Sequence, residues 1–248
     1  MRHRTDLGLI ALALTLGSAC SPLGASDRDA APDMQVVRFY LPIPGEAEVP
    51  EGRQPFAIDG SGDLTLNGKP LSAEQIASAF KAMGAADAPA ARVTIDPNAP
   101  LSIVVARLSE LGRAGEYTVS DLTQFKEYGE PGVAASVPAY RGALGAYELP
   151  VTVSLAADGK SCLAAFQGRA LGPRALQEQS FNLLDRIVHE AGGIEAIVKK
   201  IDDGVDPFAH IVAHIQSAPQ TPWRCVAGVI LAVQRSGWPV VQLEVERQ

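Results

Sequence analysis

Two histidines four residues apart, His210 and His214, are the residues whose type and spacing come closest to a metal site. Residues four apart on a β-strand share one face, and imidazole nitrogens bind zinc. The carboxylates that could supply a third ligand are Asp202, Asp203 and Asp206. With no other ligand near in sequence, we expect histidines at a surface or an interface, and neither a metal nor a cofactor.

Other patterns that carry chemistry are incomplete. Residues Asp59 to Asp63 superficially resemble the start of a calcium loop, but the distal Glu is missing, so the pattern predicts a turn. Gly60 and Gly62 lack the third glycine of a dinucleotide-binding unit. His189-Glu190 is not a double-histidine metalloprotease pattern, and no Gly-x-Ser-x-Gly elbow is present. The sequence therefore predicts no catalytic residues and a protein that is not an enzyme.

A duplicated pattern is the strongest signal in the chain. Asn67 to Leu71 recurs as Gln167 to Leu171 at an offset of 100 residues, and Pro100 to Gly115 recurs as Pro222 to Gly237 at an offset of 122. The difference between the two offsets predicts one insertion of 22 residues in the second copy. Tandem copies of one module favour a two-site or pseudo-symmetric binding surface over a single catalytic centre.

The first copy has strand and helix signals in alternation. Ile76, Ala79, Phe80 and Met83 follow helical spacing, and Ser72 is a natural N-cap for that helix. The predicted strands are 56–58, 64–66, 92–96 and 117–119, and the predicted helices are 73–83 and 101–112 or 101–115. The order is β-β-α-β-α-β.

The second copy repeats this order. Its predicted strands are 151–155, 163–166, 210–215 and 240–245, and its predicted helices are 173–190 and 223–235. The insertion falls around 191–207, and Trp223 and Trp238 are expected in the core. Two helices on one face of a short sheet give a two-layer sandwich. The predicted fold class is therefore α+β, with two tandem two-layer β-β-α-β-α-β modules.

Composition limits the classes of partner. The chain has 248 residues, which suggests two domains, and a formal net charge of −7. A nucleic-acid surface needs clustered Lys and Arg, so we expect no nucleic-acid partner.

The amino terminus has the pattern of an export signal. A basic start from Arg2 to Arg4 precedes an apolar run, Leu7 to Leu16, that is too short to span a bilayer. Gly17 to Cys20 resembles the lipobox of bacterial lipoproteins, which implies cleavage before Cys20 and lipidation of its thiol; the alternative is an ordinary secretory signal. Ser21 favours the outer membrane, reached through the lipid anchor alone.

The remaining cysteines, Cys162 and Cys225, form an even pair in an oxidising compartment. Their counterparts in the first copy are Gly62, approximately, and Ile103. A disulfide would close a loop of about 60 residues and contribute roughly 3–4 kcal/mol. The alternative is two buried free thiols.

The motifs resemble the periplasmic domain of ExbD and TolR, components of proton-driven biopolymer transport. The resemblance lies in Leu64 to Ser72, Val93 to Pro100 and Leu101 to Gly115, and more weakly in Ala165 to Leu171 and His210 to Gly237. It implies a domain that dimerises and contacts peptidoglycan or partner peptides. Family members carry one transmembrane helix with an Asp for proton flow. We find no such helix in this sequence, so proton transduction is not implied.

These observations predict a domain plan and a function. Residues 1–19 are a lipoprotein signal peptide, 20–53 a tether and entry segment with strand-type residues from Met34 to Leu41, 54–124 the first ExbD-like module, 125–148 a linker and 149–248 the second module. We expect a non-catalytic lipoprotein whose pseudo-dimer binds an envelope peptide or peptidoglycan, and an accessory role in biopolymer transport is compatible with this function. The alternatives are an envelope hydrolase with a site between the modules and a structural partner of an ExbB-type stator.

Overall fold

The structure is a computed structural model that describes residues 34–40, 55–83, 91–115, 117–119, 140–141, 147–200 and 211–246. Helices and strands are mixed, with five helices and two sheets in these residues, so the α+β prediction is confirmed. Residues 32–248 form one compact unit. The predicted signal, Cys20 and most of the predicted tether lie outside the described residues.

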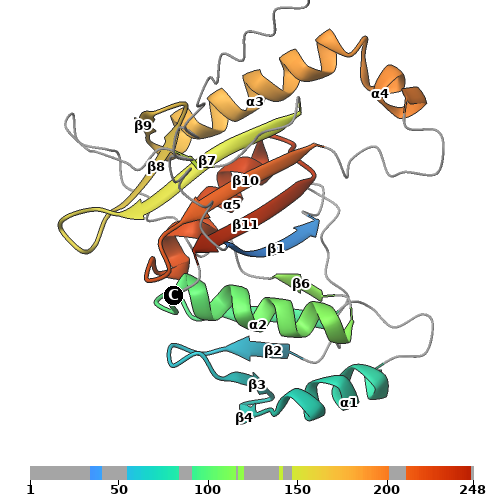
Figure 1. The fold of residues 1–248 in the computed structure, drawn as a ribbon, viewed down its shortest axis with the longest axis vertical. Coiled ribbons are helices and arrows are strands. Elements are labelled where there is room, and N and C mark those ends of the chain that lie inside the picture. The colour runs from blue at the N-terminus through green and yellow to red at the C-terminus, as the bar shows by residue number, and fades with distance from the viewer. Residues whose placement is uncertain are drawn as a thin grey trace, which may run out of the picture. The chain divides into compact units, whose positions relative to one another are not determined.

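The smaller sheet belongs to the first copy and has the order β4-β3-β2-β5-β6 (Figure 1). Strands β2 and β5 and strands β5 and β6 are parallel, whereas β3 is antiparallel to β2 and β4. The elements are β2 (Pro55–Ile58), β3 (Leu64–Leu66), β4 (Lys69–Pro70), α1 (Ala73–Met83), β5 (Ala91–Ile95), α2 (Leu101–Ala114) and β6 (Tyr117–Val119).

The larger sheet has the order β1-β11-β10-β7-β8-β9. Its elements are β1 (Met34–Tyr40), β7 (Glu148–Leu155), β8 (Cys162–Phe166), β9 (Arg169–Leu171), α3 (Pro173–Glu190), α4 (Ile194–Lys200), β10 (Val212–Ser217), α5 (Trp223–Arg235) and β11 (Val240–Glu246). If β1 is left out, the order β9-β8-β7-β10-β11 and all strand directions match β4-β3-β2-β5-β6 of the smaller sheet. Helix α4 has no counterpart in the first copy.

Both copies form the same hairpin for a local reason. Asn67 and Gly68 have φ of 51° and 75°, and Gln167 and Gly168 have φ of 50° and 74°. Two successive positive φ values are those of a type I′ turn, whose twist suits two-residue hairpins. Each turn joins a strand to a strand of two or three residues, β4 or β9, which the sequence did not predict.

The starts of the helices follow from their first residues. Gln75 N donates to Ser72 Oγ at 3.3 Å and Ser72 N donates to Gln75 Oε1 at 2.7 Å, so Ser72 is the predicted N-cap and completes a capping box. Helices α2 and α5 begin after Pro100 and Pro222 and have no side-chain cap. Their first N–H groups need partners from elsewhere.

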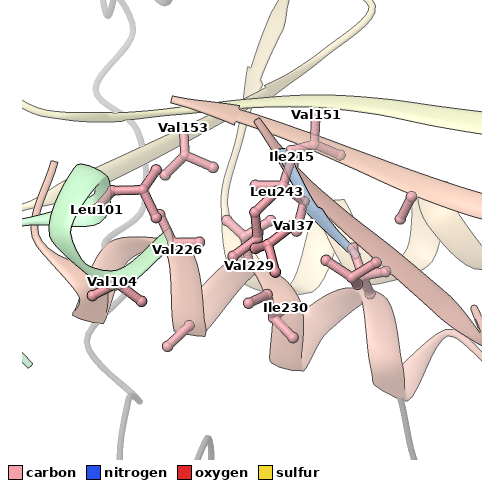
Figure 2. Packing of buried hydrophobic residues seen from close by; sticks show 14 of the residues in the cluster. Val37, Leu101, Val104, Val151, Val153, Ile215, Val226, Val229, Ile230 and Leu243 are labelled. Atoms are coloured by element: carbon pink, nitrogen blue, oxygen red, sulfur yellow. The ribbon is translucent and has the colours of Figure 1, made fainter. Parts of the chain in front are cut away.

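Most buried apolar side chains of both copies belong to one cluster. The five buried residues of α2 recur with helical spacing and all belong to it, Leu101 and Val104 among them. Figure 2 shows these two beside α5 and the larger sheet. The other labelled side chains are Val37, Val151, Val153, Ile215, Val226, Val229, Ile230 and Leu243. Since one core serves both copies, neither buries its apolar surface alone.

Several predicted boundaries need correction. The predicted tether, 20–53, includes β1, which pairs antiparallel with β11 over seven residues. The predicted linker, 125–148, ends inside β7, because that strand begins at Glu148 rather than Val151. The strand predicted at 210–215 runs from Val212 to Ser217. Parallel pairing with β7 and β11 extends β10 to Ser217, beyond its apolar run.

Candidate functional site

Of the histidines and aspartates that the sequence singled out for a metal site, the structure describes only His214. His210, Asp202, Asp203 and Asp206 lie outside the described residues. His214 lies in the middle of β10 with only 6% of its surface exposed. Among described residues, no group of three His, Cys, Asp or Glu side chains is placed to hold a metal ion.

Cys162 and Cys225 are neighbours in the core. Their Sγ atoms lie 1.99 Å apart, a bonding distance, and join β8 to α5 across 63 residues of sequence. At the corresponding place in the first copy, a Cβ on Gly62 would lie 2.3 Å from Ile103 Cγ2. The contact between the hairpin and the second helix is thus present in both copies, covalent in one and apolar in the other.

The two copies meet at the starts of α2 and α5. Backbone hydrogen bonds between them come in pairs related by the offset of 122 residues seen in the sequence, around an antiparallel bridge between Pro100 and Pro222. The pairs are Leu101 N to Thr221 O (2.9 Å) with Trp223 N to Ala99 O (2.9 Å), and Ser102 N to Pro219 O (3.0 Å) with Arg224 N to Pro97 O (2.8 Å). Each helix therefore has its first N–H groups capped by carbonyls of the other copy.

This reciprocity is the signature of a two-fold interface, in which residue i of one copy contacts residue j of the other and the reverse. One side-chain contact across this interface does not follow the relation. Arg224 Nη1 donates to Asn98 Oδ1 at 2.7 Å, but the corresponding positions hold Ser102 and Gln220. The two-fold relation therefore holds for these backbone hydrogen bonds but not for this side-chain contact.

The larger sheet has one polar face. Side chains alternate along its strands, so Ala213 and Ile215 of β10 and Val241 and Leu243 of β11 enter the core with α5. Residues between them point to the opposite face, which we call the polar face. On β1, β7, β10 and β11 its members with described side chains are Met34, Val36, Arg38, Glu148, Pro150, Thr152, Ser154, Val212, His214, Gln216, Val240, Gln242, Glu244 and Glu246, and β8 and β9 add Leu163, Ala165 and Ala170.

A hydrogen-bonded network is centred on His214 and Glu244 of this face. His214 Nδ1 lies 2.6 Å from Glu244 Oε1, and Gln242 Nε2 donates to the same oxygen at 2.8 Å. Arg38 Nε and Nη2 donate to Gln242 Oε1 at 3.0 and 2.6 Å. Tyr140 OH donates to the Glu244 carboxylate at 3.2 and 3.3 Å. The residues come from three neighbouring strands and from the chain between the copies.

The electrostatics fix the protons of this network. Burial alone would raise the pKa of Glu244, but hydrogen bonds from His214, Gln242 and Tyr140, with the charge of His214, lower it. Glu244 is therefore ionised and accepts, so Nδ1 of His214 carries a proton. Burial, and then the charge of Glu244, raise the pKa of Tyr140, which stays protonated and donates.

The other ring nitrogen of His214, Nε2, has no hydrogen-bond partner among described residues and lies 3.4 Å from Glu148 Oε1. A base oriented by a carboxylate is half of a nucleophilic site. Ser217, on the same strand, is not its nucleophile, because its Oγ bonds to Val153 O and to the Thr221 hydroxyl. The contact that the network makes outside its own strands is with the phenol of Tyr140.

Sequence reasoning missed Tyr140, Glu148, Gln242 and Glu244. One signal was present: β11 has the sequence Val-Val-Gln-Leu-Glu-Val-Glu, in which polar residues alternate with buried ones.

The predicted turn at Asp59 is formed, since its Oδ1 accepts from the N–H groups of Ser61 and Asp63. Trp223 and Trp238 are buried as predicted, each with 1% exposed.

Over the described part of the chain, no helix combines the length and the apolar character that crossing a membrane requires. No family model matches the sequence. Neither a curated protein nor a solved structure matches it. The likeness to ExbD and TolR therefore stays a prediction that rests on the motifs.

Proposed function

We propose that the chain is a non-catalytic exported lipoprotein, anchored through Cys20 at the outer membrane. Its two ExbD/TolR-like modules form an intramolecular pseudo-dimer that binds an envelope peptide or peptidoglycan. The observation that supports this most is the reciprocal set of backbone hydrogen bonds between the starts of α2 and α5. Linking two modules in one chain keeps them at an effective concentration in the millimolar range.

The shared cap has a consequence for binding. Because each module satisfies the helix start of the other, separating them would leave unpaired N–H groups at both helices and expose the common core. We infer that the pair acts as one rigid scaffold rather than as two domains on a flexible linker. A ligand would then meet a fixed surface, which lowers the ordering cost of binding.

The sheet edges suit an extended peptide. In the larger sheet, β1 already pairs with the outer edge of β11. The corresponding edge in the smaller sheet belongs to β6, and no other described strand pairs with it beyond β5. Strand addition needs only backbone partners, so it requires none of the polar motifs that the sequence lacks.

Site-specific photo-crosslinking in intact cells tests this function. A photoreactive residue at Thr118 of β6 should form adducts with one envelope component, whereas the same residue at Phe181, an exposed position on α3, should not. Co-sedimentation with purified peptidoglycan separates the two ligand classes. Absence of any adduct at Thr118 together with absence of co-sedimentation would refute the binding function.

The lipid anchor has its own control. Cys20→Ser removes the thiol to which lipid would be attached, so this variant should leave the membrane fraction while retaining the adduct formed at Thr118. If the wild-type chain and Cys20→Ser fractionate alike, the proposed lipid anchor at Cys20 is wrong. The crosslinking at Thr118 tests the binding function independently of this result.

A further inference from the structure

A two-residue piece of the chain between the modules, Tyr140–Arg141, lies against the polar face. The side-chain amide of Gln216 pairs with both backbone groups of Arg141: Arg141 N donates to Oε1 at 2.8 Å, and Nε2 donates to Arg141 O at 2.9 Å. A side-chain amide used in this way recognises peptide backbone whatever the sequence, as a neighbouring strand would.

The side chains of the same two residues are also recognised. Glu244 accepts from the phenol of Tyr140, whose ring stands edge-on to His214 with centroids 6.1 Å apart. Arg141 Nη1 donates to Glu246 Oε1 at 3.2 Å. Gln216 lies beside Glu244 across the sheet, and Glu246 follows two residues further along the same face of β11. Backbone, phenol and guanidinium are therefore each held by a different residue.

The recognising groups are prepared for this contact. With Tyr140 in place Glu244 is only 6% exposed, and its carboxylate also accepts hydrogen bonds from His214 and Gln242. A carboxylate held by these two neighbours loses little freedom when a phenol binds, which is what preorganisation contributes to affinity. The ligand, by contrast, is partly accessible, since Arg141 is exposed and Tyr140 only half-buried.

A cavity of about 220 Å³ adjoins the contact. It lies where β7, β10 and β11 end, and the residues that line it include Arg141, Thr152, Ser154, Gln216, Ser217 and Glu246. The carboxyl ends of parallel strands are a common place for ligands. Space beside Arg141 with hydroxyl and amide groups on its wall accommodates more peptide than the two residues seen there.

We propose that the polar face is a peptide-binding site for extended segments in which an aromatic hydroxyl precedes a basic residue. Tyr140–Arg141 is its internal ligand, which a partner segment of the same chemistry displaces. This rests on the binding function proposed above and names a class of partner for it. The carboxylates of Glu148, Glu244 and Glu246 favour a basic ligand over an acidic one.

Removing the side chains of the internal ligand should make the peptide-binding site accessible to an added peptide. The variant Tyr140→Ala/Arg141→Ala, called the emptied variant, removes the phenol from Glu244 and the guanidinium from Glu246, and keeps only the backbone contact of residue 141 with Gln216. The probe is a fluorescein-labelled peptide with the sequence of residues 136–144, and the measurement is fluorescence anisotropy. An internal ligand at about 1 mM effective concentration weakens an external peptide of about 100 μM Kd roughly tenfold. The peptide should therefore bind the variant about tenfold more tightly than the wild-type chain.

Matched controls identify the contacts. A peptide with Phe for Tyr and Gln for Arg keeps the backbone and should bind the emptied variant much more weakly. Adding Glu244→Gln to that variant should also weaken the unaltered peptide, whereas adding Glu178→Gln, an exposed change on α3, should not. Circular dichroism establishes that each variant is folded.

A measurement on the unaltered chain avoids variants that fail to fold. Hydrogen exchange should show the amide of Arg141 protected, and excess peptide should raise its exchange rate. Equal binding to the emptied and wild-type chains, or no binding to either, overturns the proposal. The β6 adducts do not depend on Tyr140–Arg141, so they persist in that case and separate this failure from failure of the binding function.

Discussion

Gly62 marks the point where the hairpin of the first module touches α2, and an added methyl group there tests the packing directly. Its φ is +90°, and an ideal Cβ would lie 2.3 Å from Ile103 Cγ2 and 3.1 Å from Ile103 Cδ1. Its carbonyl also accepts from Arg107 Nε at 2.9 Å, so the backbone is tied to α2 and cannot easily move away.

Two terms make up the expected loss of stability in Gly62→Ala. A left-handed backbone costs an L-residue about 1–2 kcal/mol. Forcing a methyl group into a packed contact costs about 1–3 kcal/mol more, because Ile103 must leave its position. The sum is about 2–5 kcal/mol.

Gly68→Ala is the matched control. Its φ is +75°, but nothing lies within 4 Å of the position of its Cβ. Only the backbone term applies, so this variant should lose about 1–2 kcal/mol. The difference between the two variants isolates the contact with α2.

Urea unfolding followed by circular dichroism gives both values. The double variant Gly62→Ala/Ile103→Ala completes a cycle, because Ile103→Ala removes the atoms with which the methyl group collides. The two changes should be coupled by about 1–3 kcal/mol, with the double variant more stable than the sum of the single changes predicts. Equal losses for Gly62→Ala and Gly68→Ala, with no coupling to Ile103, would refute the placement of the hairpin against α2.

Three further predictions concern the second module. Reducing Cys162–Cys225, which closes a loop of 63 residues, should lower the free energy of unfolding by about 4 kcal/mol; unchanged urea midpoints with and without reductant would contradict this. Trp238→Phe removes the donor to Ser180 O at 3.0 Å and should cost about 1–3 kcal/mol in thermal unfolding, against no loss if that bond is absent. The fold holds the pKa of Glu244 below its usual 4.5, so the ionised carboxylate stabilises the folded state fully above pH 4.5, and this contribution is lost as pH falls through the folded pKa. Glu244→Gln should therefore be less stable than the wild-type chain at pH 7, and its free energy of unfolding should fall less steeply in acid. Parallel pH profiles of the two chains would exclude the network.

The parts of the fold that the sequence predicts are those set by nearby residues. Helical spacing and the cap at Ser72 are local, and the hairpin at Asn67-Gly68 needs only two residues with positive φ. The repeat offset of 122 residues adds one relation between distant parts of the chain, because it assigns the starts of α2 and α5 to corresponding positions.

What the sequence does not predict depends on partners distant in the chain. Strand β1 has apolar and aromatic residues suited to a strand, but its pairing with β11 joins positions about 200 residues apart, such as Arg38 and Gln242. The sequence does not predict the network at His214 for the same reason, since Tyr140, Glu148 and Glu244 come from separate segments. Register across strands places Glu244 and Gln242 beside His214, and spacing along one strand gives no information about that register.

The comparison of corresponding positions shows why the polar face of the second module differs from that of the first. Arg92 lies opposite Pro55 as His214 lies opposite Pro150, and Thr94 lies opposite Ala57 as Gln216 lies opposite Thr152. The backbone positions are therefore available in both modules, but the residues that bind Tyr140–Arg141 are present in one.

Buried charged groups lower stability unless the surroundings compensate for their lost hydration. Two features reinforce the second module. The Cys162–Cys225 disulfide joins its sheet to α5, and strand β1 extends that sheet. Arg38 of β1 also donates to Gln242 in the network. In the first module, Gly62 against Ile103 takes the place of that disulfide. The buried network at His214 and Glu244 therefore lies in the half of the fold that has both of these supports.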